Sequence, residues 1–160
     1  MIQISFEKLI DRMEISVSSI VAHDEALFYS TAEKRIPEPI NLKRLITDGK
    51  IKEFSASREE IAVFLNKFDR VFVEGLHAGE AESLALIMLE RLKDTLYCSG
   101  DATAIKALAM IGHSSDGISF EKLLKKAGLQ KKLRKQFKDK FFRENIAIGS
   151  ENLITGKGLK

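Results

Sequence analysis

The most apolar stretch of the chain, residues 81–89, follows a polar opening in which Gly79 precedes two acids, Glu80 and Glu82. A helix that is apolar on most sides must be covered on most sides. We therefore predict a central buried helix that begins near Gly79 and ends near residues 91–93. Its two acids lie in the first turn, where free backbone N–H groups and the helix dipole favour negative charge.

The first third of the chain shows shorter patterns. Residues 15–17 and 51–54 are apolar enough to be strands, and the earlier one leads into a helix that carries Glu25. Residues 42–46 have helical spacing, and Asp48-Gly49 ends that helix in a turn. Ser57 and Glu60 have the spacing of a capping box at the start of another helix.

After the central helix, residues 95–98 are the best strand candidate, and Ser99, Gly100 and Asp101 follow directly. We predict helices over 102–111 and 118–127, a basic helix over 130–143, and a last strand at 146–148 before a loose end. Residues 71–73 are predicted as a strand or an extended connection into the central helix.

Helices that alternate with short strands predict a three-layer α/β/α domain around a mainly parallel central sheet. At 160 residues and 44% hydrophobic composition, the chain suits one domain with one core. The single cysteine, Cys98, allows no internal disulfide, and no apolar run approaches the roughly 20 residues of a membrane span. We expect a soluble, cytoplasmic protein without a membrane partner.

The acids that stand out are Glu25, Glu80, Glu82 and Asp101, which stand near the predicted ends of helices and strands. If these ends meet, the carboxylates form an oxygen-only cluster of the kind that holds Mg²⁺ or Mn²⁺. Such an ion suits phosphodiester cleavage. The structural alternatives are a solvated Glu25 and an Asp101 that only caps a helix. The three histidines lack zinc-site spacing, so we expect structural or surface roles for them.

The run Leu-His-Ala-Gly-Glu-Ala-Glu-Ser-Leu-Ala-Leu at 76–86, with Ser99-Gly100-Asp101 and residues 117–124, resembles the PIN domain superfamily. The VapC-like toxin branch is similar in its Gly-Glu-Ala-Glu motif. The resemblance implies a Mg²⁺- or Mn²⁺-dependent endoribonuclease, often a homodimer and often silenced by a small antitoxin protein. Carried over by position, the implied catalytic and metal-ligating residues are Glu25, Glu80 (or Glu82) and Asp101, with Glu82 and Ser99 supporting.

The chain departs from that family pattern at its start, because no apolar strand ending in Asp precedes Ile15. Three explanations stay open. The sequence begins downstream of the true start, it has been shortened, or the protein is a degenerate PIN-like domain without nuclease activity that binds RNA or a protein partner. We favour a nuclease with an N-terminally shortened PIN-like domain over residues 1–128. Gly100 is a smaller departure, since the branch often has a second acid there.

Residues 129–160 are predicted as a separate basic helix and tail. Its cations stand close together in the sequence: Lys131, Lys132, Arg134, Lys135 and Lys138. A cationic flank of this kind attracts the phosphates of RNA without reading their sequence. The alternatives are an acidic protein partner and an ordinary solvated face.

Overall fold

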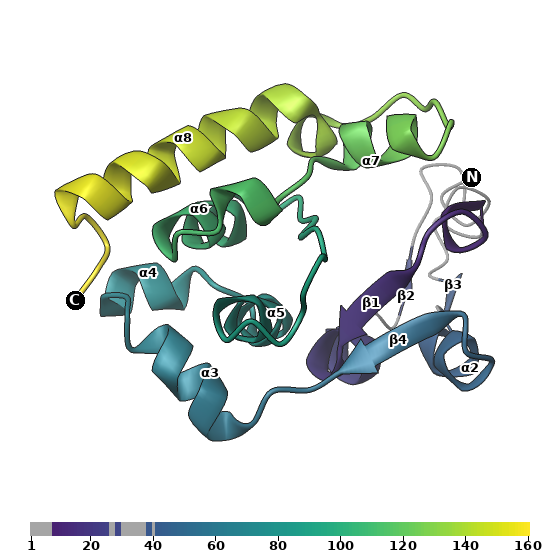
Figure 1. Cartoon of the computed structure of the whole chain (residues 1–160), viewed down its shortest axis with the longest axis horizontal. Coiled ribbons are helices and arrows are strands. Elements are labelled where there is room, and N and C mark those ends of the chain that lie inside the picture. The colour runs from purple at the N-terminus through teal and green to yellow at the C-terminus, as the bar shows by residue number, and fades with distance from the viewer. Residues whose placement is uncertain (1–7, 26–27, 30–37, 40) are drawn as a thin grey trace. The chain divides into compact units, whose positions relative to one another are not determined.

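The computed structural model describes residues 8–25, 28–29, 38–39 and 41–160 (Figure 1). The chain forms two compact units, Met1–Ser55 and Ala56–Lys160. The sequence analysis placed a boundary after residue 128, whereas residues 129–160 here belong to the second unit. Among the described residues, no helix is both long and apolar enough to cross a membrane.

The first unit is built on two parallel strands, β1 (Ile15–Ser18) and β4 (Ile51–Phe54), with Ile15 opposite Ile51. A π-helix, η1 (Val21–Glu25), and the helix α2 (Leu42–Thr47) lie between them in the chain. A two-residue antiparallel ladder joins β2 (Phe28–Tyr29) to β3 (Glu38–Pro39). Both predicted strands and the short helix are confirmed, and Gly49 turns the chain after α2 with a φ of +69°.

The second unit is helical. Its α-helices are α3 (Arg58–Leu65), α4 (Arg70–Glu74), α5 (Ala78–Met88), α6 (Ala102–Met110), α7 (Phe120–Lys126) and α8 (Asp139–Thr155). Two 3₁₀ turns, η2 (Ser114–Asp116) and η3 (Lys135–Phe137), precede α7 and α8. Within this unit α5 packs against α3 and α6, and α8 packs along α6 (Figure 1).

Helix α5 is the buried centre that the sequence predicts. Leu84, Ala85 and Leu86 are fully buried, so consecutive residues are covered and the helix has no wide solvent face. The helix ends at Met88 rather than near residues 91–93. Glu90 has a left-handed φ of 53°, and this conformation stops the helix before the basic residues.

The predicted strand at 95–98 is wrong. Only Tyr97 pairs there, in a single parallel bridge with Gly117, and its amide donates to the Asp116 carbonyl over 2.6 Å. The described part of the chain is therefore mixed α/β and mostly helical, with one two-stranded parallel sheet. The three-layer PIN-like arrangement is not confirmed.

Residues 71–73 form the middle of helix α4, so the prediction of a strand or extended segment there is wrong. Asp69 caps the helix, because its Oδ1 accepts a hydrogen bond from the Phe72 amide over 2.8 Å. The Phe72 ring also stacks on Phe68 with 4.9 Å between ring centroids. The cap and this contact outweigh the strand preference of two valines.

The predictions for the last 30 residues are also wrong. Residues 130–134 are irregular, the residues predicted as a strand at 146–148 lie inside α8, and the supposedly loose end is helical to Thr155. The buried positions of α8 are Phe142, Asn145, Gly149 and Asn152, which recur at helical spacing. Three of these four are not hydrophobic, and so the apolar pattern does not reveal the buried face.

Candidate metal centre

Two helix N-termini of the second unit carry the residues of the candidate site. Glu80 lies in the first turn of α5, and Asp101 is the N-cap of α6. Asp101 Oδ1 accepts hydrogen bonds from the amides of Thr103 and Ala104 over 2.7 and 2.9 Å. The predicted capping role is therefore real, and it fixes the direction in which this carboxylate points.

His77, Glu80 and Asp101 come together at these helix ends. Each offers one nitrogen or oxygen atom, and the three atoms all lie within 4.8 Å of one another. The side chain of His77 is exposed, whereas those of the two acids are half-buried. An ion placed among these atoms is therefore reachable from solvent on the histidine side.

Ser99 joins the two carboxylates. Its hydroxyl donates to Oε1 of Glu80 over 3.1 Å, and its oxygen accepts the Asp101 amide hydrogen over 3.0 Å. The sequence analysis gave this residue a supporting position beside the acids. The contacts place it there, within hydrogen-bond distance of one acid and of the backbone of the other.

Glu80 is in an environment that disfavours its charge. Burial is the largest cause that raises the pKa of its carboxyl group, and the nearby negative charge of Asp101 adds to it. The Ser99 hydrogen bond acts in the opposite direction. Oε2 of Glu80 is buried without a hydrogen-bond partner among the described residues. A buried oxygen of this kind is stabilised by a proton or by a cation.

The loop before Asp101 adds two buried groups that stay neutral. Burial, followed by the charge of Glu80, raises the pKa of Tyr97 far above its usual value. Burial raises the pKa of the Cys98 thiol to about 11. Neither group supplies a nucleophile near neutral pH, so the chemistry of this site depends on its carboxylates and on His77.

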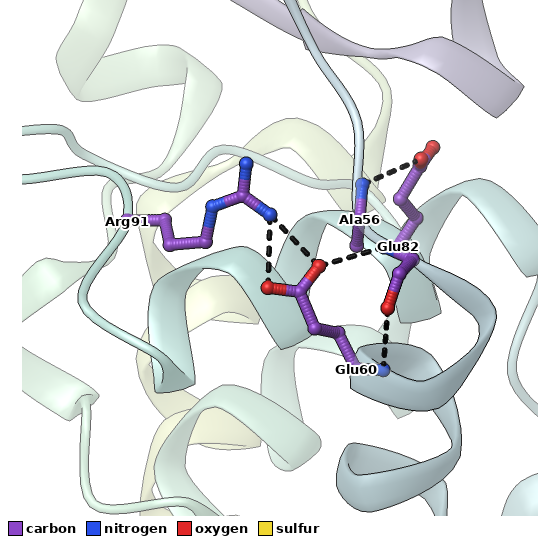
Figure 2. A network of polar contacts seen from close by, with 5 residues as sticks. Ala56, Glu60, Glu82 and Arg91 are labelled. Carbon is purple, nitrogen blue, oxygen red and sulfur yellow. Dashed lines mark hydrogen bonds and ion pairs between the residues drawn. The ribbon is translucent and has the colours of Figure 1, made fainter.

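Glu82 serves a different contact from Glu80, as Figure 2 shows. It is 2% exposed, and its Oε1 accepts the Ala56 amide hydrogen over 3.1 Å. The same network contains the predicted capping box of Ser57 and Glu60, which is confirmed, and an ion pair from Arg91 to Glu60 at 2.8 Å. Of the two acids that the family motif offers on the central helix, Glu80 is the one in the metal-binding group.

Glu25 lies in the first unit, where it is the last residue of η1 and is exposed. The group of His77, Glu80 and Asp101 forms within the second unit from its own residues. Of the predicted acids, the structure thus brings Glu80 and Asp101 together.

His77 is the member of this group that the sequence analysis missed. It precedes Glu80 by three residues, and that spacing places two side chains on one side of a helix start. The search for zinc motifs concerned pairs of histidines or cysteines, whereas this site combines one histidine with two acids. A histidine three residues before an acid was the available signal.

No family model, no curated protein and no solved structure matches this chain. The likeness to PIN domains is therefore carried by the motif residues alone.

Proposed function

We propose that the second unit binds a divalent metal ion through His77, Glu80 and Asp101 and uses it to hydrolyse phosphodiester bonds in RNA, as a PIN-like endoribonuclease. The observation that carries the proposal is the buried, unpartnered Oε2 of Glu80 beside a second carboxylate and an imidazole. An arrangement that destabilises an ionised carboxylate in the free protein is relieved when a cation binds. The role as toxin of a toxin–antitoxin pair, with homodimerisation, rests on the resemblance.

The donor set fits a divalent ion of the first transition row better than Mg²⁺. Mg²⁺ prefers oxygen ligands and retains several waters, whereas Mn²⁺ accepts both carboxylate oxygen and imidazole nitrogen. Three protein ligands leave positions for water and for phosphate oxygens. We therefore propose Mn²⁺ as the preferred ion and His77 as the residue that sets this preference.

When bound, such an ion polarises the phosphate and offsets the charge that develops on the leaving oxygen. The chain itself orients the ligands. The α6 amides hold Asp101 in one direction, and Ser99 holds Glu80. Glu80 gives up its proton more readily as positive charge approaches, since the ionised form is then stabilised. The first turns of α5 and α6 also direct their N–H groups toward anionic groups.

The decisive experiment measures Mn²⁺ and Mg²⁺ binding by calorimetry for the wild type and three variants, Glu80→Gln, Asp101→Asn and His77→Ala. The first two keep size and hydrogen bonding, and Asn caps α6 nearly as well as Asp. We expect each acid substitution to weaken Mn²⁺ binding at least tenfold and His77→Ala to lower the preference for Mn²⁺ over Mg²⁺. His113→Ala is the control, because His113 pairs with Asp116 on η2.

Cleavage of a structured RNA in Mn²⁺ then tests the reaction. Activity that Glu80→Gln and Asp101→Asn abolish supports the nuclease. If the wild type cleaves no RNA and its metal binding is unaffected by both acid substitutions, the nuclease proposal is rejected. RNA or protein binding without cleavage would then favour the alternative of a degenerate PIN-like binding module.

A further inference from the structure

The basic segment, residues 131–138, is the most densely charged part of the surface of the second unit. It holds five cations and no acid: Lys131, Lys132, Arg134, Lys135 and Lys138. The last four of these are exposed, and none of those four has an acid of the described chain within ion-pair distance. Positive charge that no acid neutralises attracts phosphate groups.

The basic segment is attached directly beside the candidate metal centre. Phe137 packs over Gly100, the residue before Asp101, so closely that a Cβ at Gly100 would lie 2.6 Å from Cε1 of the ring. The ring also meets Phe120 edge to face, with 5.9 Å between centroids. Lys135 and Lys138, which stand on either side of Phe137 in the chain, are therefore held next to the loop that carries Ser99 and Asp101.

A cavity of about 310 Å³ opens on this surface. Its walls are formed by Lys135, Lys138, Lys140, Phe141 and Glu144. Glu144 offsets one of the three ammonium groups, since it lies 3.9 Å from Lys140, and the other two have no described acid partner. Ammonium groups bind phosphates, and an aromatic ring beside them offers a surface for an unpaired base.

We propose that this cavity binds a phosphate, with its neighbouring base, of a single-stranded RNA segment that leads into the metal centre. Lys135 and Lys138 contact the phosphate, and Phe141 stacks on the base. The inference rests on the proposed function for the identity of the strand, but it predicts binding that requires no metal ion. The small glycine at position 100 is what brings the lysines close to the acids.

The test measures binding of a fluorescent 12-nucleotide single-stranded RNA by anisotropy, in EDTA, over a range of salt concentrations. We expect Lys135→Gln with Lys138→Gln to weaken binding at least tenfold. The slope of log affinity against log salt should fall by about 1.4, which is roughly 0.7 for each lost phosphate contact on a single strand. Lys125→Gln with Lys126→Gln is the matched control, because these exposed α7 lysines carry the same charge outside the cavity.

Equal losses in the two double variants would show a general charge effect and overturn the inference, as would an unchanged affinity in the cavity variant. Gly100→Ala tests the attachment of the segment, and we expect it to weaken RNA binding while circular dichroism confirms the fold. An RNA affinity in this variant equal to that of the wild type would contradict the proposed link to the metal centre.

Failure of the proposed function is distinguishable. Glu80→Gln removes metal binding if the nuclease proposal is right, and it leaves RNA binding in EDTA intact if the cavity acts independently. The cavity double variant should bind Mn²⁺ as the wild type does. A protein that binds RNA through the cavity but no metal ion would support this inference and reject the nuclease.

Discussion

The Ser99 hydroxyl donates a hydrogen bond to Oε1 of Glu80 over 3.1 Å and so connects the loop before α6 to the start of α5. The same oxygen accepts the amide hydrogen of Asp101. One small side chain thus controls the placement of both acids, and its removal separates the metal-binding geometry from the fold more cleanly than removal of a ligand does.

We expect Ser99→Ala to lower the free energy of unfolding by about 1 kcal/mol, because two hydrogen bonds to a half-buried group are lost. Mn²⁺ affinity should fall by roughly tenfold, the effect typical of a group that orients a ligand. Urea denaturation and calorimetry measure the two effects. Ser115→Ala, on an exposed serine of η2, is the control. Normal Mn²⁺ binding in a destabilised Ser99→Ala protein would mean that the hydroxyl serves only the fold.

Glu80→Gln should stabilise the metal-free protein near neutral pH. The pKa of Glu80 is raised in the folded state, mainly by burial and then by Asp101. A group with a raised pKa contributes stability that is fully present below its unfolded value, near 4.5, and is lost as pH rises through the folded value. The advantage of Glu80→Gln should therefore appear above that range and vanish in acid.

Thermal unfolding of this variant at pH 4 and pH 7.5, without metal and with Mn²⁺, gives the measurement. Mn²⁺ should raise the melting temperature of the wild type and leave that of Glu80→Gln unchanged. Glu151→Gln, on an exposed acid of α8, is the control for loss of one charge. A Glu80→Gln protein that is less stable than the wild type at pH 7.5 would contradict the assigned cost of ionising Glu80.

Ser19 should stabilise the first unit in a pH-dependent way. Its hydroxyl donates to Oε1 of Glu53 over 2.8 Å, and this bond, followed by the one with His23, lowers the pKa of Glu53. A lowered pKa gives stability that is present above the unfolded value near 4.5 and lost as pH falls through the folded value.

We expect Ser19→Ala to lower stability by about 1 kcal/mol at pH 7 and by clearly less at pH 3. Hydrogen exchange of the β1 and β4 amides reports on this unit alone. Ser16→Ala on β1 is the control, since the Ser16 side chain forms no hydrogen bond with any described residue. An equal loss at both pH values would rule out the carboxylate as the cause.

Gly149→Ala should destabilise the second unit by about 1–3 kcal/mol through overpacking. A Cβ at this position would lie 2.5 Å from the Lys106 carbonyl oxygen, where α8 crosses α6. Ala147→Val, which adds more volume on the exposed side of the same helix, should lower stability by less than about 0.7 kcal/mol. Equal losses in the two variants, measured by urea denaturation, would place the effect in helix propensity rather than in packing.

Sequence reasoning succeeded where local chemistry determines the element. The capping box of Ser57, the turn at Gly49 and the buried character of α5 all depend on residues close together in the chain. It failed where tertiary contacts decide. Residues 95–98 have strand composition but a single paired residue, Tyr97, and α8 hides its buried face behind two asparagines and a glycine.

The candidate site shows the same division. Glu80, Ser99 and Asp101 follow from motif spacing, and the structure brings them together. The different position of Glu82 depends on the Ala56 amide, which lies 26 residues away in sequence. No local pattern around Glu82 predicts that partner.

Gly100 also limits how this protein can change. An acid at that position, as the resembling toxins often have, would add a carboxylate beside Asp101 but would collide with the ring of Phe137. Stronger metal binding by that route would therefore displace the lysines that flank the ring. A lineage or an engineer that mutates position 100 alters the affinities for ion and nucleic acid in opposite directions with one substitution.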